Sequence, residues 1–88
     1  MKTRFRGHWW HFRRRDSKIL DGECQMNDAP REMWIAKRIR GLRLLEALVH
    51  ESLHACFPDL TEDAVEEAGR DIAAHLWRLG WRVEKPHK

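Results

Sequence analysis

The sequence predicts a small α+β domain in which an antiparallel sheet of about three strands packs on two helices. Three observations support this prediction. A chain of 88 residues has room for one hydrophobic core. Alternating and β-prone residues gather in its first half, and apolar residues recur at three- and four-residue spacing in its second half. We therefore expect a single domain over residues 1–88, with strands within about 3–39, helices at about 42–57 and 61–79, and a tail over 81–88.

Three strands account for the first half of the chain. Arginines alternate with other residues at the start, and the β-prone Trp9, Trp10 and Phe12 follow, which is typical of a strand with one covered face. Asp21 and Gly22 mark a bulge or a second turn in the return strand. In order, the expected segments are a strand over 3–12, a turn at 15–17, a return strand over 18–24, a loop over 25–31 and a third strand over 33–39.

Two amphipathic helices account for the second half. Pro58 ends the first helix, and Thr61 is a good N-cap for the second, because its hydroxyl can accept a backbone N–H. Glu62 and Asp63 follow in the first turn, where negative charge suits the helix dipole, and Gly80 is a natural end. The apolar stripes consist of Leu44, Leu45, Leu48, Val49, Leu53 and Cys56 in the first helix and of Val65, Ala68, Ile72, Leu76 and Leu79 in the second.

Charge and composition argue against a disulfide-bonded, exported or membrane-spanning protein. Basic residues gather in the first fifth of the chain and acidic ones between Asp59 and Asp71, a split typical of a solvated surface that could also steer an acidic partner. Cys24 and Cys56 form no CxxC pair, which predicts two reduced thiols. No apolar run approaches the roughly 20 residues of a membrane span, and the start lacks the apolar segment of a signal peptide. We therefore expect a cytoplasmic protein without a membrane partner.

The segment from His50 to His54, with the sequence HESLH, has the chemistry of a metal site. Residues four apart on a helix lie on the same face, so the two imidazoles can direct nitrogens at one ion about 2 Å from each. Glu51 is next to His50 on the helix surface, where its carboxylate can take a proton from a zinc-bound water. Catalytic zinc sites use three protein ligands, and an acidic helix that could supply the third follows at once. The pattern predicts one zinc ion per chain, with Glu51 as the catalytic base.

The motif and the acidic helix after it resemble the gluzincin-type zinc metallopeptidases, in which a glutamate from the helix after HExxH is the third zinc ligand. The segment from His50 to about Leu79 is also similar to small single-domain zincin-like proteins of phage and bacterial genomes. The metzincin continuation is absent, because Phe57 and Leu60 stand where that class has glycine and histidine. The resemblance implies a zinc-dependent metallopeptidase, in which Glu51 activates the zinc-bound water against a carbonyl of a peptide or protein substrate.

Two glutamates are candidates for the third ligand under this resemblance. Thermolysin-like members carry Asp four residues after the ligand, as Glu67 does with Asp71. They also carry small residues three and seven positions after it, as Glu66 does with Gly69 and Ala73. On a helical wheel Glu66 borders the apolar stripe, whereas Glu67 faces solvent. We therefore expect Glu66 to be the ligand and keep Glu67 as the alternative, under which Asp71 would orient a ligating histidine.

The resemblance also implies a sheet packed on the active-site helix, with an edge strand beside the substrate. We expect residues 33–39 to form that strand, because an extended peptide can add to a free sheet edge. Many of these enzymes stabilise the oxyanion with Tyr or a further His. This chain has no Tyr, so His8, His11, His75 or an arginine would have to take that role.

A non-catalytic binding module is the alternative function. In this interpretation the zincin-like scaffold is structural, and the Arg- and Trp-rich residues 4–15 contact nucleic acid or protein. Arginine can contact phosphates while aromatic rings stack on bases. The hydrolase is the preferred interpretation, and nucleic acid is the less favoured partner.

Overall fold

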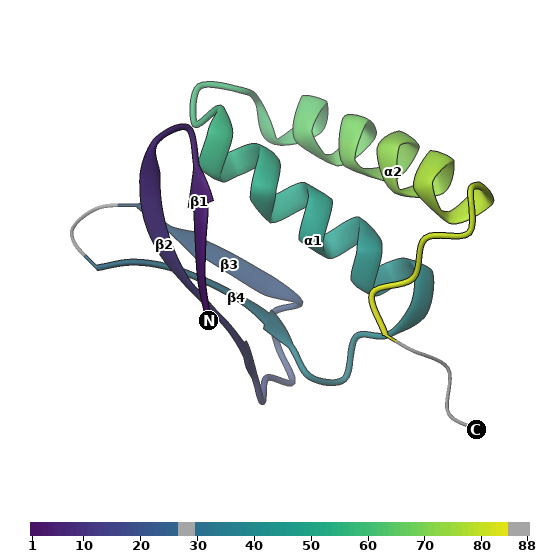
Figure 1. The fold of residues 1–88 in the computed structure, drawn as a ribbon, viewed down its shortest axis with the longest axis horizontal. Helices are drawn as coiled ribbons and strands as arrows, with labels where there is room; N and C mark the ends of the chain where they lie inside the picture. The colour runs from purple at the N-terminus through teal and green to yellow at the C-terminus, as the bar shows by residue number, and fades with distance from the viewer. Residues whose placement is uncertain (27–29, 85–88) are drawn as a thin grey trace.

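The computed structural model describes residues 1–26 and 30–84. The elements in chain order are β1 (Lys2–Phe5), β2 (His8–Arg15), β3 (Gly22–Gln25), β4 (Arg31–Ala36), α1 (Gly41–Cys56) and α2 (Glu62–Arg78). Figure 1 shows the strands gathered in one sheet, with α1 next to it and α2 beside α1. The predicted α+β class is confirmed, and the sheet has four strands where about three were expected.

The predicted first strand is a hairpin. Residues 3–12 divide between β1 and β2, which pair antiparallel with Thr3 opposite Trp10. The two residues between the strands, Arg6 and Gly7, have positive φ values of 47° and 83°. This is the backbone of a two-residue type I′ turn, whose twist matches that of the strands. Gly7 was the sequence signal for this turn, because glycine adopts a positive φ without strain. Residues alternate on both sides of the turn, so the periodicity did not show that one strand ends and another begins there.

The sheet is mixed, whereas an antiparallel sheet was expected. Its order is β1-β2-β4-β3, with β2 and β4 parallel and the outer pairs antiparallel. Because β4 is paired on both sides, the prediction that residues 33–39 offer a free edge to a substrate is wrong. Among the described strands, β1 and β3 lie at the edges of the sheet.

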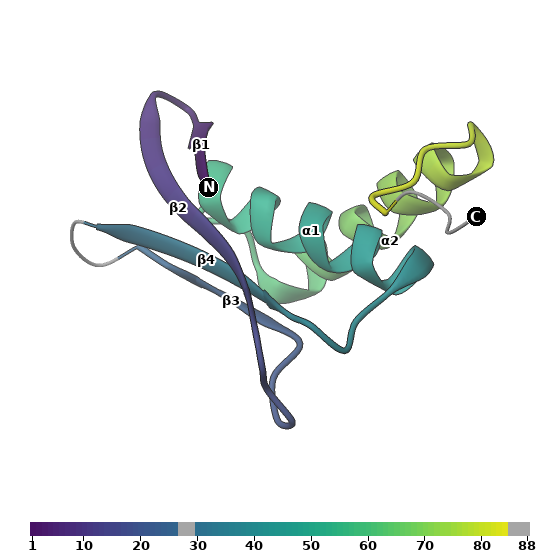
Figure 2. The ribbon, with the colours of Figure 1, turned by 60° about the horizontal axis from the view of Figure 1, so that its bottom comes forward.

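The core lies between the sheet and α1. Alternate residues of a strand point to opposite faces, and Phe12 and Ile35 belong to the set that packs against α1. Figure 2 shows both helices on the same side of the sheet, and α2 packs on α1 without contacting the strands. The buried apolar residues are Trp10, Met33, Trp34, Ile35, Ala36, Ile39, Leu44, Leu45, Val65 and Ala73.

Both predicted ends of α2 are confirmed. The Thr61 hydroxyl accepts the backbone N–H of Ala64 at 3.2 Å. Gly80 has φ 96°, and its N–H and that of the next residue donate to carbonyls of the last turn at 3.0 Å each, which is the Schellman arrangement. Residues 81–84 form no strand. Residues 27–29 of the predicted loop and 85–88 of the predicted tail lie outside the described residues.

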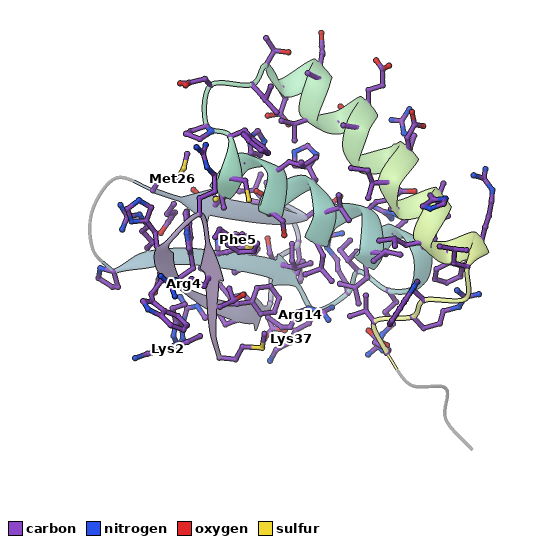
Figure 3. The ribbon with its side chains drawn as sticks, turned by 45° about the horizontal axis from the view of Figure 1, so that its top comes forward. Lys2, Arg4, Phe5, Arg14, Met26 and Lys37 are labelled. Carbon is purple, nitrogen blue, oxygen red and sulfur yellow. The ribbon has the colours of Figure 1, made fainter. Side chains whose placement is uncertain are left out.

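Two arginines tie the ends of α1 to the sheet. Arg14 Nη2 donates to the carbonyls of Ala36 at 3.0 Å and Ile39 at 2.8 Å, and Figure 3 shows it reaching toward this segment before α1. Arg6 Nη1 donates to the carbonyl of Cys56 at 2.8 Å, at the C-terminal end of the helix, where positive charge is favourable. The helix that carries the HESLH motif is therefore held against the sheet at both ends. Neither α1 nor α2, the helices of the described residues, has the length and apolar character needed to cross a membrane.

Candidate metal centre

The two histidines of the motif meet a carboxylate from α2. The Nε2 atoms of His50 and His54 lie 3.2 Å apart. Glu62 places Oε1 2.8 Å from His50 Nε2 and Oε2 2.9 Å from His54 Nε2. Among residues 1–26 and 30–84, these three form the group whose potential ligand atoms all lie within 4.8 Å of one another. His50, His54 and Glu62 are therefore close enough to bind a metal ion.

The spacing of the two imidazole nitrogens is close to that of two ligands on one tetrahedral metal ion, while the 2.8 and 2.9 Å contacts of Glu62 are hydrogen-bond distances. Zinc–nitrogen bonds of about 2.0–2.1 Å at a tetrahedral angle place two nitrogens about 3.3 Å apart. The observed separation of the Nε2 atoms of His50 and His54 is 3.2 Å. Nitrogen and carboxylate oxygen are also donors that zinc accepts readily. Three protein donors leave room for a fourth ligand, as a catalytic zinc site requires.

The antiparallel packing of the helices explains how Glu62 reaches the histidines. Residues 57–61 reverse the chain, so the last turns of α1 face the first turns of α2 (Figure 1). Gly69 allows the two helices to approach closely, since a Cβ built there would lie 3.4 Å from both Cα and N of His50. Glu62 stands at the start of α2, two turns before this contact, beside the last turn of α1. The side chain is 65% exposed, so it reaches the histidines from the solvent side.

The structure does not bring the predicted third ligand into this cluster. Glu66 Oε1 accepts a hydrogen bond from Arg70 Nη2 at 2.9 Å. Glu66, Glu67 and Asp71 are all exposed, and of the three only Glu66 lines the same cavity as His50, one turn beyond Glu62. Sequence reasoning assigned Glu62 only to the helix dipole. Its position in the first turn after a short connection was the signal that it could reach the histidines of α1.

Glu51 lines an open cavity of about 480 Å³ together with His50 and Glu62. The wall of this cavity comes from α1, from α2 and from the start of β3 with the segment before it. Burial raises the pKa of Glu51 to about 7; the charge of His50 opposes this rise, and Glu62 and Glu23 add to it. Glu51 is not one of the three residues whose donor atoms converge, so its carboxylate is separate from the candidate ligands.

Two arginines line the cavity. Arg43 lines it from α1 and Arg70 from α2. The three histidines that were candidates for stabilising an oxyanion, His8, His11 and His75, do not line the cavity. Among the candidates from the sequence, the arginines are therefore the ones that the fold places near Glu51.

Comparisons with protein families, with curated proteins and with solved structures find no match for this chain. Interpretation of the site therefore rests on its own residues. These are two histidines and a glutamate that could bind a metal ion, and a half-buried glutamate beside them.

Proposed function

We propose that this chain is a zinc-dependent hydrolase that cleaves peptide bonds. The observation that carries the proposal is the convergence of His50, His54 and Glu62, of which His50 and Glu62 line the same cavity as Glu51. A helix alone accounts for two histidines on one face, but not for a carboxylate from another helix in contact with both. When bound, zinc would polarise a substrate carbonyl and lower the pKa of a water molecule.

The position of Glu51 supports a role as general base. It follows His50 directly, and the helix presents both residues to the same cavity. Its carboxylate is free of the cluster and could accept a proton from water and pass it to the leaving amine. Arg43 and Arg70 could stabilise negative charge that develops on the carbonyl oxygen.

The edge strand β3 supports a peptide as the substrate. β3 pairs with β4 and is the last strand in the sheet order, so its other edge is free among the described strands. A Cβ built at Gly22, its first residue, would lie 3.6 Å from Glu51 Cγ. An extended peptide that added to this edge would therefore pass close to the base. This arrangement replaces the edge that the sequence had suggested within residues 33–39.

For the third ligand we propose Glu62, with Glu66 as the competing candidate. Glu62 contacts both imidazoles, whereas Glu66 is paired with Arg70. Both glutamates line the cavity, which keeps Glu66 as a competitor for this role.

The test of hydrolysis compares three zinc-loaded proteins on a diverse peptide library read by mass spectrometry. Glu51→Gln should retain zinc and lose about 10²–10⁴-fold in cleavage rate, which is the usual contribution of a general base. Asp63→Asn is the matched control, because Asp63 is an exposed carboxylate of α2 outside the cavity. Equal cleavage by Glu51→Gln and wild type would refute the assignment of the base, and zinc-loaded wild type that cleaves nothing would refute a general peptidase.

A further inference from the structure

The face of the sheet that turns away from α1 is basic. Strand pairing sets Lys2 opposite His11 and Arg4 opposite Trp9, and alternation along β2 puts Arg13 and Arg15 on the same face as His11. Figure 3 shows Lys2 extending away from the helices. Glu23 and Glu32 are the acidic residues on this face, fewer than the basic ones. The residues that give it its character are Lys2, Arg4, Trp9, His11, Arg13 and Arg15.

Trp9 exposes aromatic surface on this face. It is 59% exposed, and the guanidinium of Arg4 lies 5.5 Å from its ring centroid. Trp34 lies on the same face but is only 4% exposed, and the Arg15 guanidinium lies over its ring at 4.5 Å. An arginine lies over each of the two indoles, but only the indole of Trp9 keeps an accessible surface.

An open hollow of about 480 Å³ lies beside Trp9. Its lining includes Lys2, His11, Arg31 and Glu32, and it shares no residue with the cavity of the metal cluster. The volume falls within the roughly 300–1,000 Å³ typical of small-ligand sites. A planar group stacked on Trp9 would have cationic side chains on its border.

The charge distribution of the molecule favours a polyanion at this face. Four of the seven Lys and Arg in residues 1–18 lie on this face, whereas α2 contains five acidic residues and two arginines. Since α2 lies beyond α1, a polyanion on the open sheet face keeps away from the acidic helix (Figure 2). An acidic protein could pair with the basic residues of this face, but it would not explain the exposed indole of Trp9. The unpaired bases of a single-stranded nucleic acid stack on exposed aromatic rings.

We propose that this face of the sheet binds single-stranded nucleic acid. A base stacks on Trp9, and Lys2, Arg4 and Arg13 contact the phosphates. A duplex is not expected to bind as tightly, because its bases are stacked on one another and present no free face to Trp9. The proposal does not depend on the metal cluster or on hydrolysis, since the two surfaces share no residue.

The test measures fluorescence anisotropy of a labelled oligothymidylate of about 15 nucleotides, a length that covers the usual sites of single-strand binders. Trp9→Ala should weaken binding about 5- to 150-fold, because stacking is worth about 1–3 kcal/mol and about 1.4 kcal/mol corresponds to tenfold. Trp9→Phe should stay near wild type, which separates loss of stacking from misfolding. Trp81→Ala removes an indole that is 64% exposed on the C-terminal segment and should have no effect.

Charge contacts are tested by the salt dependence of the same binding. Arg13→Gln should reduce the slope of log K against log salt by about 0.7, the value for one phosphate contact on a single strand. Arg78→Gln on α2 is the matched control and should leave the slope unchanged. A chelator should also leave the affinity unchanged, which keeps this test separate from the hydrolase.

Three results would overturn the proposal. The first is wild type that does not bind the oligonucleotide at about 50 mM salt, where electrostatic contacts are strongest. The second is equal weakening by Trp9→Ala and Trp81→Ala, which would mean that no particular indole stacks on a base. The third is equal or tighter binding of polyglutamate or of duplex DNA, which would assign the face to acidic proteins or to general attraction of polyanions.

Discussion

Replacing Gly22 by Ala should destabilise the protein, because this residue lies where β3, β4 and α1 meet. A Cβ built at Gly22 lies 2.8 Å from Ile35 Cδ1 and 2.8 Å from the carbonyl oxygen of Trp34. Carbon atoms pack at about 3.5–4.0 Å, so the added methyl would overlap both groups. Ile35 is fully buried, and the carbonyl belongs to the backbone of the paired strand β4. Neither can move without disturbing the core or the pairing of β3 with β4.

Overpacking of this kind costs about 1–3 kcal/mol. In a domain of this size each kcal/mol shifts Tm by about 4–8 °C, so Gly22→Ala should lower Tm by at least about 4 °C. Unfolding followed by circular dichroism, with heat and with urea, measures the change. Gln25→Ala in the same strand is the control, since Gln25 is exposed and its change should stay within about 0.5 kcal/mol. A Gly22→Ala protein as stable as wild type would refute the packing argument.

Three further predictions concern the metal and the thiols. In a chelator competition, Glu62→Gln should weaken zinc binding by more than the 10–100-fold typical of groups outside the coordination shell. The loss should also exceed that from Glu66→Gln. The reverse order would make Glu66 the third zinc ligand. Removing zinc with a chelator should lower the Tm of wild type but not that of His54→Ala. The reason is that zinc at 100 times its Kd adds about 2.7 kcal/mol to the free energy of unfolding of a protein that binds it. Equal shifts in Tm would contradict a zinc site at His54. Burial raises the pKa of Cys24 from 9.0 to about 12, so the thiolate fraction at neutral pH falls about 1,000-fold. Alkylation of a Cys56→Ser protein should therefore be far slower in the native state than in denaturant, and equal rates would exclude a protected Cys24.

The helices could be predicted because their signals are local. Thr61 and Gly80 act through bonds to residues within a turn or two, and both ends of α2 lie within one residue of the prediction. The helical spacing of His50 and His54 fixes their common face whatever surrounds them. These features depend on three to five neighbouring residues, so the sequence contains them in full.

The sheet could not be predicted in the same way, because strand order depends on partners distant in the chain. Residues 3–12 alternate through the turn, so the periodicity does not show that the chain reverses at Arg6 and Gly7. The parallel pairing of β2 with β4 arises because β3 lies at the edge of the sheet, outside β4. Trp34 is buried although α1 covers the other face, since Arg15 shields its ring. Alternation alone would have placed that residue in solvent.

The third candidate ligand was missed because Glu62 has a sufficient local explanation. A carboxylate in the first turn of a helix is worth about 0.3–1 kcal/mol through the helix dipole, and Asp63 has the same advantage. The contact with both histidines depends on how α2 crosses α1 near Gly69, which no local pattern describes. The two roles can be separated: without zinc, Asp63→Asn loses only the helix-dipole contribution, whereas Glu62→Gln also weakens the contacts with the two imidazoles. With zinc the loss from Glu62→Gln should grow, while that from Asp63→Asn stays the same. If zinc did not increase the loss from Glu62→Gln, the carboxylate of Glu62 would not be a zinc ligand.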